Sequence, residues 1–151
     1  MTNTTIVHVH GRRVWDSRGR PTVEAEIALA NGAVGRAIAP AGASTGSGEA
    51  LDLRDGGESF GGLDVTTALT RLNSEIAETL CGMDARDQSR IDQRLVDLDG
   101  TPNRSRLGGN AIVASVSSRD VRRAVDVAVV GAGLVGLATA RELLLRRPGT
   151  R

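Results

Sequence analysis

Residues 22–39 read TVEAEIALANGAVGRAIA, and this stretch decides the fold of the chain. Apolar and polar residues alternate over 22–30, as in a strand that buries only one of its faces. Asn31-Gly32 follows at once and is the strongest two-residue signal for a tight hairpin turn. Residues 33–39 then return as a second strand. The sequence therefore predicts an antiparallel hairpin at this point.

A further strand is predicted just before the hairpin. In residues 5–14, TIVHVHGRRV, apolar and polar residues alternate from Ile6 onward, and two arginines stand near the end. Because only short links join the three strands, they form an antiparallel meander. Its exit leads the chain directly into residues 40–50, PAGASTGSGEA, which hold glycines and hydroxyl residues in place of any regular pattern.

Beyond residue 60 the apolar period changes from two to 3.6, which indicates helices. The first is predicted over 65–80, with Asp64 as its N-cap and Gly82 just past its end. A second is predicted over 85–98 and a third from about 110 to 116. The buried positions expected on the first two are Val65, Ala68, Leu69, Leu72, Ile76, Leu80, Ile91, Leu95 and Leu98. Residues 1–118 thus read as an α+β domain, a meander packed by helices.

Composition restricts the chemistry of the chain. Trp15 and Phe60 are the only aromatic residues, so the core must consist of Val, Ile, Leu and Ala. All 19 basic residues are arginines, which excludes lysine as a base or Schiff-base former within this chain. Cys81 is the single cysteine, and we expect it to pack beside the first helix in a reducing, cytoplasmic compartment. No signal core and no run of about 20 apolar residues is present, so no membrane segment is predicted.

The loop at 40–50 is the candidate functional segment, and we call it the lid loop. Its glycines favour a mobile loop, and its hydroxyls and bare backbone suit a hard cation or a phosphate. Apart from Glu49 it offers no acid, base or nucleophile. This composition favours a cover for chemistry that other residues perform.

Three long segments carry a resemblance to a known family. They are DSRGRPTVE (16–24), PAGASTGSGEALDLRDG (40–56) and LDGTPNRSRLGGNAI (98–112). Together they make residues 5–117 resemble the N-terminal domain of enolase, the magnesium-dependent lyase of glycolysis also called phosphopyruvate hydratase. Ala41, Gly48, Gly109 and the passage 57–65 depart from the family pattern, which suggests a divergent member.

The resemblance implies roles for particular residues. In that family the loop closes over a phosphorylated substrate, and the serine that matches Ser44 helps to coordinate Mg²⁺. The implied lid residues are Gly42, Ala43, Ser44 and Thr45. The residues that match Arg12, Arg18 and Glu24 contact the barrel domain of a partner subunit in a homodimer. The catalytic lysine and the carboxylates that hold magnesium lie in that barrel, outside this chain, so we expect no catalytic residues here. Glu49, Asp52 and Asp55 follow the lid loop without a lysine to work with.

Residues 119–151 differ in character and are predicted to be a second unit. They carry more arginines than acids, whereas residues 1–118 carry more acids than arginines. An apolar run at 124–130 precedes GAGLVG at 131–136, and a helical pattern continues to about 147. This order is typical of the opening of a Rossmann-type unit, in which Gly131, Gly133 and Gly136 approach a pyrophosphate.

This second segment resembles the N-terminus of an FAD-dependent oxidoreductase that acts on 2-hydroxy acids. The acid that holds the ribose is expected about 20 residues on, where the chain ends, so we do not expect FAD to be retained. Three hypotheses stay open: an enolase-type lid domain that is inactive alone, a flavoprotein fragment, and a non-catalytic module that docks on an enolase-like subunit.

Two smaller features complete the sequence. His8 and His10 lie two apart on a predicted strand, so they share a face. Without a third ligand nearby, they are interpreted as a surface pair and not as a metal site. The arginine-rich end lacks interleaved aromatic residues, so no nucleic-acid partner is expected.

Overall fold

The computed structural model describes residues 3–40 and 49–118. Most of the lid loop and the predicted second unit, 119–151, lie outside the described residues. The described elements, in chain order, are β1 (Ile6–Trp15), β2 (Pro21–Leu29), β3 (Val34–Ala39), a 3-10 turn η1 (Ser59–Gly62), α1 (Thr66–Arg71), a π-helical turn η2 (Leu72–Ile76), α2 (Ala77–Leu80), α3 (Gln88–Asp99) and α4 (Gly109–Ser118).

The three strands form the predicted antiparallel meander, in the order β1-β2-β3. The turn at Asn31-Gly32 is confirmed: Gly32 has a φ of +84°, and its N–H donates to the Leu29 carbonyl at 2.9 Å. Register places Arg12 opposite Glu24, and His10 opposite Glu26. The period of two therefore divides β2 cleanly between two faces.

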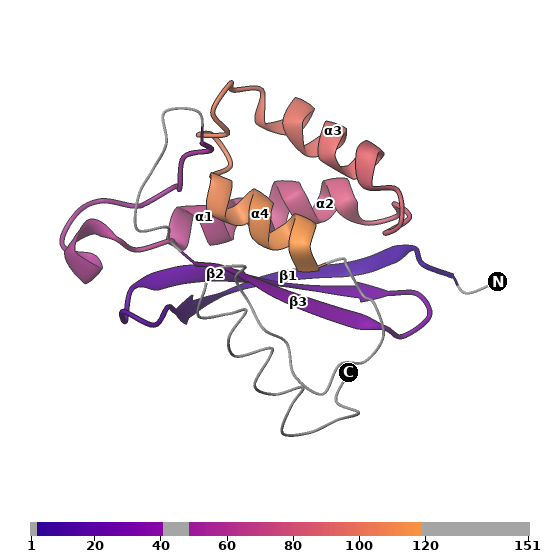
Figure 1. The fold of residues 1–151 in the computed structure, drawn as a ribbon, viewed down its shortest axis with the longest axis horizontal. Helices are drawn as coiled ribbons and strands as arrows, with labels where there is room; N and C mark the ends of the chain where they lie inside the picture. The colour runs from indigo at the N-terminus through magenta and orange to yellow at the C-terminus, as the bar shows by residue number, and fades with distance from the viewer. Residues whose placement is uncertain (1–2, 41–48, 119–151) are drawn as a thin grey trace, which may run out of the picture. The chain divides into compact units, whose positions relative to one another are not determined.

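The helices cover one face of this sheet (Figure 1). α1 and α2 lie along β1, and α4 lies along β2 and β3, whereas α3 packs against α2 and α4 farther from the strands. We call the covered side the inner face and the opposite side the outer face. The inner face is aliphatic as predicted, and its fully buried members include Val23, Ala25 and Ile27.

The predicted helix at 65–80 is present, but its centre is not α-helical. α1, η2 and α2 follow one another without a break from Thr66 to Leu80, and η2 is a π-helical turn. At this turn the Asn73 side chain bonds Gly11 of β1 twice, accepting from its N–H at 2.8 Å and donating to its carbonyl at 3.0 Å. Leu72 packs so close to Gly11 that a Cβ there would lie 2.8 Å from Leu72 Cδ2.

The N-cap prediction for this helix is wrong. Asp64 accepts from the Val65 N–H and pairs with Arg13, and it does not bond the free N–H groups of the first helical turn. Asp55, nine residues before Asp64, caps the helix instead. Its carboxylate accepts hydrogen bonds from the N–H of Thr66 at 2.7 Å and from the N–H of Thr67 at 2.9 Å. The cap is therefore supplied by a residue that is remote in sequence.

The predicted helix at 85–98 begins later, at Gln88, where Asp87 caps it by accepting from the Arg90 N–H. Leu98 is only half-buried, contrary to expectation, and the side chain that enters the core is Asp99, at 2% exposed. Asp99 accepts hydrogen bonds from Thr101 and from the Leu107 N–H. Burial raises its pKa, but these bonds outweigh burial and leave the pKa below its ordinary value.

The predicted burial of the cysteine is wrong, whereas the predicted exposure of the two histidines is confirmed. Cys81 is exposed, so the expectation that it packs is wrong; the helix ends at Leu80 and releases the next residue to the surface. His8 and His10 are exposed, as the surface-pair interpretation requires. None of the helices in the described ranges is long and apolar enough to cross a membrane.

Candidate functional site

The site begins where β3 delivers the chain to the lid loop. Ala39 is the last residue of β3, and its carbonyl accepts a hydrogen bond from the buried Thr22 hydroxyl of β2. Pro40 is the last described residue before the loop, and Glu49 is the first after it. Gly42, Ala43, Ser44 and Thr45, the predicted lid residues, lie outside the described residues.

The returning end of the loop is clamped to the start of α4. The Asn110 side chain accepts from the Leu53 N–H at 3.1 Å and donates to the Leu53 carbonyl at 3.2 Å. The Gly109 N–H donates to the Leu51 carbonyl at 2.7 Å, and the Leu51 N–H donates to Asn103 at 2.9 Å. Residues 51–53 are thus held through backbone groups, as an added strand would be.

Two glycines allow this close approach. A Cβ on Gly108 would lie 2.5 Å from the Leu53 Cβ, and Gly108 has a φ of +95°, which favours glycine. A Cβ on Gly109 would lie 2.9 Å from the Ala50 Cβ. Gly109 therefore allows Ala50 to lie close against the start of α4.

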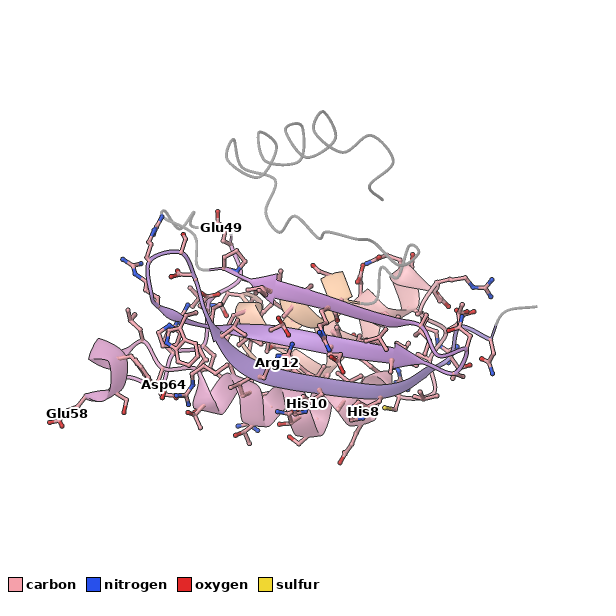
Figure 2. All side chains as sticks on the ribbon, turned by 90° about the horizontal axis from the view of Figure 1, so that it is seen from below. His8, His10, Arg12, Glu49, Glu58 and Asp64 are labelled. Carbon is pink, nitrogen blue, oxygen red and sulfur yellow. The ribbon has the colours of Figure 1, made fainter. Side chains whose placement is uncertain are left out.

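A hollow of about 260 Å³ opens between the two ends of the loop. Its lining consists of Ala39, Pro40, Glu49, Ala50, Asp52, Gly109, Asn110 and Val113. Of its two acids, Asp52 is paired with Arg54 at 3.0 Å, and Glu49 is exposed beside the loop (Figure 2). The described lining of the hollow holds no pair of a base and a nucleophile. The expectation that this chain carries no catalytic residues stays a prediction.

Arg54 fastens the segment after the lid loop to the sheet. Its guanidinium donates to the Pro21 carbonyl at 2.6 Å and to the Leu63 carbonyl at 2.9 Å, and its side chain is 18% exposed. Asp55, the next residue, caps α1. Burial raises the pKa of Asp55, but hydrogen bonds from Thr67 and Thr66 outweigh that effect and lower it. Sheet, helix and lid loop are therefore joined by one short segment.

The three predicted interface residues are only partly brought together. Arg12 and Glu24 face each other across β1 and β2 and form an ion pair on the outer face. Arg18 lies in the turn between these strands, and its side chain has no hydrogen bond or ion pair within 3–40 and 49–118. That turn is set by Asp16, which accepts from the N–H groups of Arg20 and Arg18. The Arg20 bond in particular lowers the pKa of Asp16.

The residues described here do not make a magnesium site by themselves. No group of three His, Cys, Asp or Glu side chains within 3–40 and 49–118 is placed to hold a metal ion. Ser44, the predicted magnesium ligand, lies outside the described residues, so its role stays a prediction.

Sequence reasoning missed the residues that hold the lid loop in place, namely Arg54, Asp55 and Asn110. Asn110 carried a usable signal, because asparagine next to the first turn of a predicted helix often bonds free backbone groups. Arg54 and Asp55 gave no such signal, because their partners are carbonyls and N–H groups of other segments.

Comparison with known proteins agrees with this geometry. Residues 6–128 match the family described as enolase, N-terminal domain. The enolase of Lactobacillus helveticus is 50% identical over 126 residues, which cover 83% of this chain and 29% of that protein. The enolase of Lactobacillus acidophilus is 53% identical over 113 residues, which cover 75% of this chain and 26% of that protein. The aligned part of the chain thus spans 26–29% of the length of these curated relatives.

Proposed function

This chain belongs to the family of enolase N-terminal domains, and we propose that it supplies the lid of a magnesium-dependent lyase of the phosphopyruvate hydratase kind. In this proposal Gly42, Ala43, Ser44 and Thr45 cover a phosphorylated substrate, and Ser44 gives oxygen ligands to Mg²⁺. The ion, when bound, supplies positive charge against the anionic substrate. The chain's own part is to position the loop and to exclude water.

The observation that carries this proposal is the anchoring of both ends of the lid loop. Ala39 is bonded to Thr22, and residues 51–53 are bonded to Asn103, Gly109 and Asn110. Two fixed ends are what a lid requires, because its closure has to turn about defined points. Family membership adds the substrate class, because both relatives are named enolases.

We propose that the 151 residues do not catalyse the reaction alone. The chain contains no lysine, and Asp52, between residues 49 and 55, is paired with Arg54, a guanidinium that stays protonated and cannot act as a base. A barrel domain outside these 151 residues would have to supply the base and the carboxylates that hold magnesium. Purified chain with Mg²⁺ and 2-phosphoglycerate should therefore give no turnover above a blank. Clear turnover would overturn this part of the proposal.

The lid function itself is tested by a chimaera. Residues 6–118 of this chain would replace the matching segment of Lactobacillus acidophilus enolase, and dehydration of 2-phosphoglycerate would be followed by absorbance. We expect an active chimaera in which Ser44→Ala lowers kcat/KM by roughly 100-fold, because a group that acts at the reacting site is lost. Ser47→Ala, a hydroxyl in the same loop, is the matched control and should keep most of the activity. Equal activities of the two variants would contradict the role of Ser44.

Docking on a barrel through Arg12, Arg18 and Glu24 is part of the same proposal. Arg18 is the best-placed cation, because its side chain makes no hydrogen bond or ion pair within the described residues and interacts with Asp16 only through its charge, whereas Arg12 and Glu24 are already paired. In the chimaera, Arg18→Ala should weaken the dimer more than Arg90→Ala, an exposed arginine of α3. Analytical ultracentrifugation at several concentrations would measure this, and equal dimer constants would count against the interface.

A second candidate concerns residues 124–151, on the sequence pattern alone. We propose that they are the opening of an FAD-binding unit, with Gly131, Gly133 and Gly136 at the pyrophosphate turn. The family match reaches residue 128 and so overlaps this segment at its start. Since one strand and one helix do not enclose a cofactor, the purified chain should be colourless. Retained flavin absorbance would instead favour the flavoprotein hypothesis.

A further inference from the structure

The only two histidines of the chain lie side by side on β1. The imidazole ring centroids of His8 and His10 are 6.2 Å apart, and the ring planes are within 11° of parallel. Both side chains are exposed, and Figure 2 shows His8, His10 and Arg12 following one another along the strand. Neither residue belongs to the lid loop or to the predicted interface set.

The backbone explains why the two rings meet. Residues two apart on a strand share a face, and the pairing of β1 with β2 is regular from His8 to Trp15. The register is irregular between Ile6 and His8, so that Val7 and His8 are both exposed in succession. The irregularity fixes the face of His8 and leaves His10 directly opposite Glu26.

The charges around the pair are balanced. Arg12 is paired with Glu24, and Arg36 is paired with Glu26, all on the outer face. The hydrogen bond from Arg36, together with the charges of Arg36, Arg12 and His10, keeps the pKa of Glu26 below its ordinary value. An added cation therefore meets no excess of positive charge. It also finds a carboxylate across from His10, able to accept the free N–H of a metal-bound imidazole.

In place of the sequence-based interpretation of a plain surface pair, we propose that His8 and His10 form a two-imidazole chelate for a divalent transition-metal ion, with Cu²⁺ bound most tightly. Imidazole suits copper, nickel and zinc, and among such ions copper heads the order of affinities. Metal–nitrogen distances are about 2.0–2.1 Å, so the two donor atoms must converge to roughly 3 Å. The rings must therefore turn from their stacked arrangement, which exposed side chains do at little cost. Water would fill the remaining coordination positions.

This site differs in kind from the magnesium ligand proposed at Ser44. Mg²⁺ prefers oxygen ligands and gives up its water reluctantly, so it should not compete for two imidazoles. The absence of a third protein ligand within the described residues makes the chelate open and exchangeable. A weak, reversible surface site is what this geometry supports.

The test uses the full chain without an affinity tag, in a Cys81→Ser background that removes the only thiol. Calorimetric titration with Cu²⁺ should show one ion per chain, and either His8→Ala or His10→Ala should weaken binding by roughly tenfold or more, because chelation becomes single-point attachment. Val7→Ala is the matched control, since it also truncates an exposed side chain of β1, and it should bind like the parent. Electron paramagnetic resonance of the Cu²⁺ complex should show coupling to two imidazole nitrogens.

The proposal fails if the double variant His8→Ala/His10→Ala binds Cu²⁺ as tightly as the parent. It also fails if each single variant loses only about twofold, the statistical effect of removing one of two independent sites. Millimolar Mg²⁺ should leave the Cu²⁺ titration unchanged, and displacement by Mg²⁺ would contradict an imidazole site.

Discussion

The inner and outer faces of the sheet use the same strand for opposite purposes. Along β2, Val23, Ala25 and Ile27 are wholly buried under the helices, while Glu24 and Glu26 alternate with them and pair with arginines of β1 and β3. Apolar burial contributes about 25 cal/mol per Å², whereas an ion pair that keeps one exposed partner, as these keep Arg12 and Arg36, contributes about 0–1 kcal/mol. The comparison teaches that stability resides on one face and that the other is free to serve recognition.

The largest change in the free energy of unfolding should come from a substitution on the inner face. Ile27→Ala is expected to lower the free energy of unfolding by about 3 kcal/mol, because it removes a fully buried side chain and leaves a cavity. Urea unfolding followed by far-ultraviolet circular dichroism would measure it. The neighbouring Glu26→Ala, on the outer face, is the control. Comparable losses for both variants would break the distinction between the faces.

A second inner-face test concerns the contact between β1 and the π-helical turn. Gly11→Ala should cost about 1–2 kcal/mol, because the new methyl group must displace Leu72 in a packed core. Adding Leu72→Val should recover part of this loss, by removing a methylene at the point of contact. If the double variant were less stable than the sum of the single changes, the clash would not be the cause.

Removing the cap of α1 should lower the free energy of unfolding by a smaller amount, which depends on pH. Asp55→Asn is expected to cost about 1 kcal/mol at pH 7, since the carboxylate bonds the N–H groups of Thr66 and Thr67. The folded pKa of Asp55 is lowered, so its contribution is complete above the ordinary pKa of about 4 and is lost as the pH falls through the folded value.

Urea titrations at pH 7 and near pH 3 would check this. The difference between the parent and Asp55→Asn should shrink at the lower pH. A difference that grew on acidification would give the wrong sign and exclude the carboxylate as the source. Asp64→Asn, at the position that the sequence favoured as the cap, should leave the N–H groups of Thr66 and Thr67 bonded to Asp55.

The smallest effect is expected on the outer face. A double-mutant cycle of Arg12→Ala and Glu24→Gln should give a coupling of about 0.5 kcal/mol, falling with added salt, because the pair is partly exposed. Denaturant unfolding at low and high ionic strength would measure it. A coupling of several kcal/mol would mean that this face, too, holds the fold together.

Local pattern was sufficient for the strands, the Asn31-Gly32 turn and most of the helical face from Val65 to Leu80. It failed where a partner came from another segment. Asp64 has the sequence position of a cap, but the free N–H groups of Thr66 and Thr67 donate to Asp55. Leu98 continues the apolar pattern of α3, but the turn at Gly100 directs Asp99 inward, where Thr101 and the Leu107 N–H satisfy it.

The candidate site shows the same division. The unusual composition of the lid loop could be recognised in residues 40–50. Interface roles for Arg12 and Glu24 were predicted from family resemblance and stay predictions. Asparagine next to the first turn of a predicted helix indicates that Asn110 bonds backbone groups, but its partner Leu53, 57 positions away, could not be predicted. Sequence patterns report on neighbours along the chain, whereas this loop is held by neighbours in space.

The double hydrogen bond between Asn73 and Gly11 has a consequence for how copies of the molecule meet. In the described sheet, β1 is an edge strand of ten residues, and an open edge invites strands from other chains to add to it. At the middle of that edge, one side-chain amide already occupies the N–H and the carbonyl that an incoming strand would need. Strand addition at Gly11 would therefore require the Asn73 amide to be displaced first.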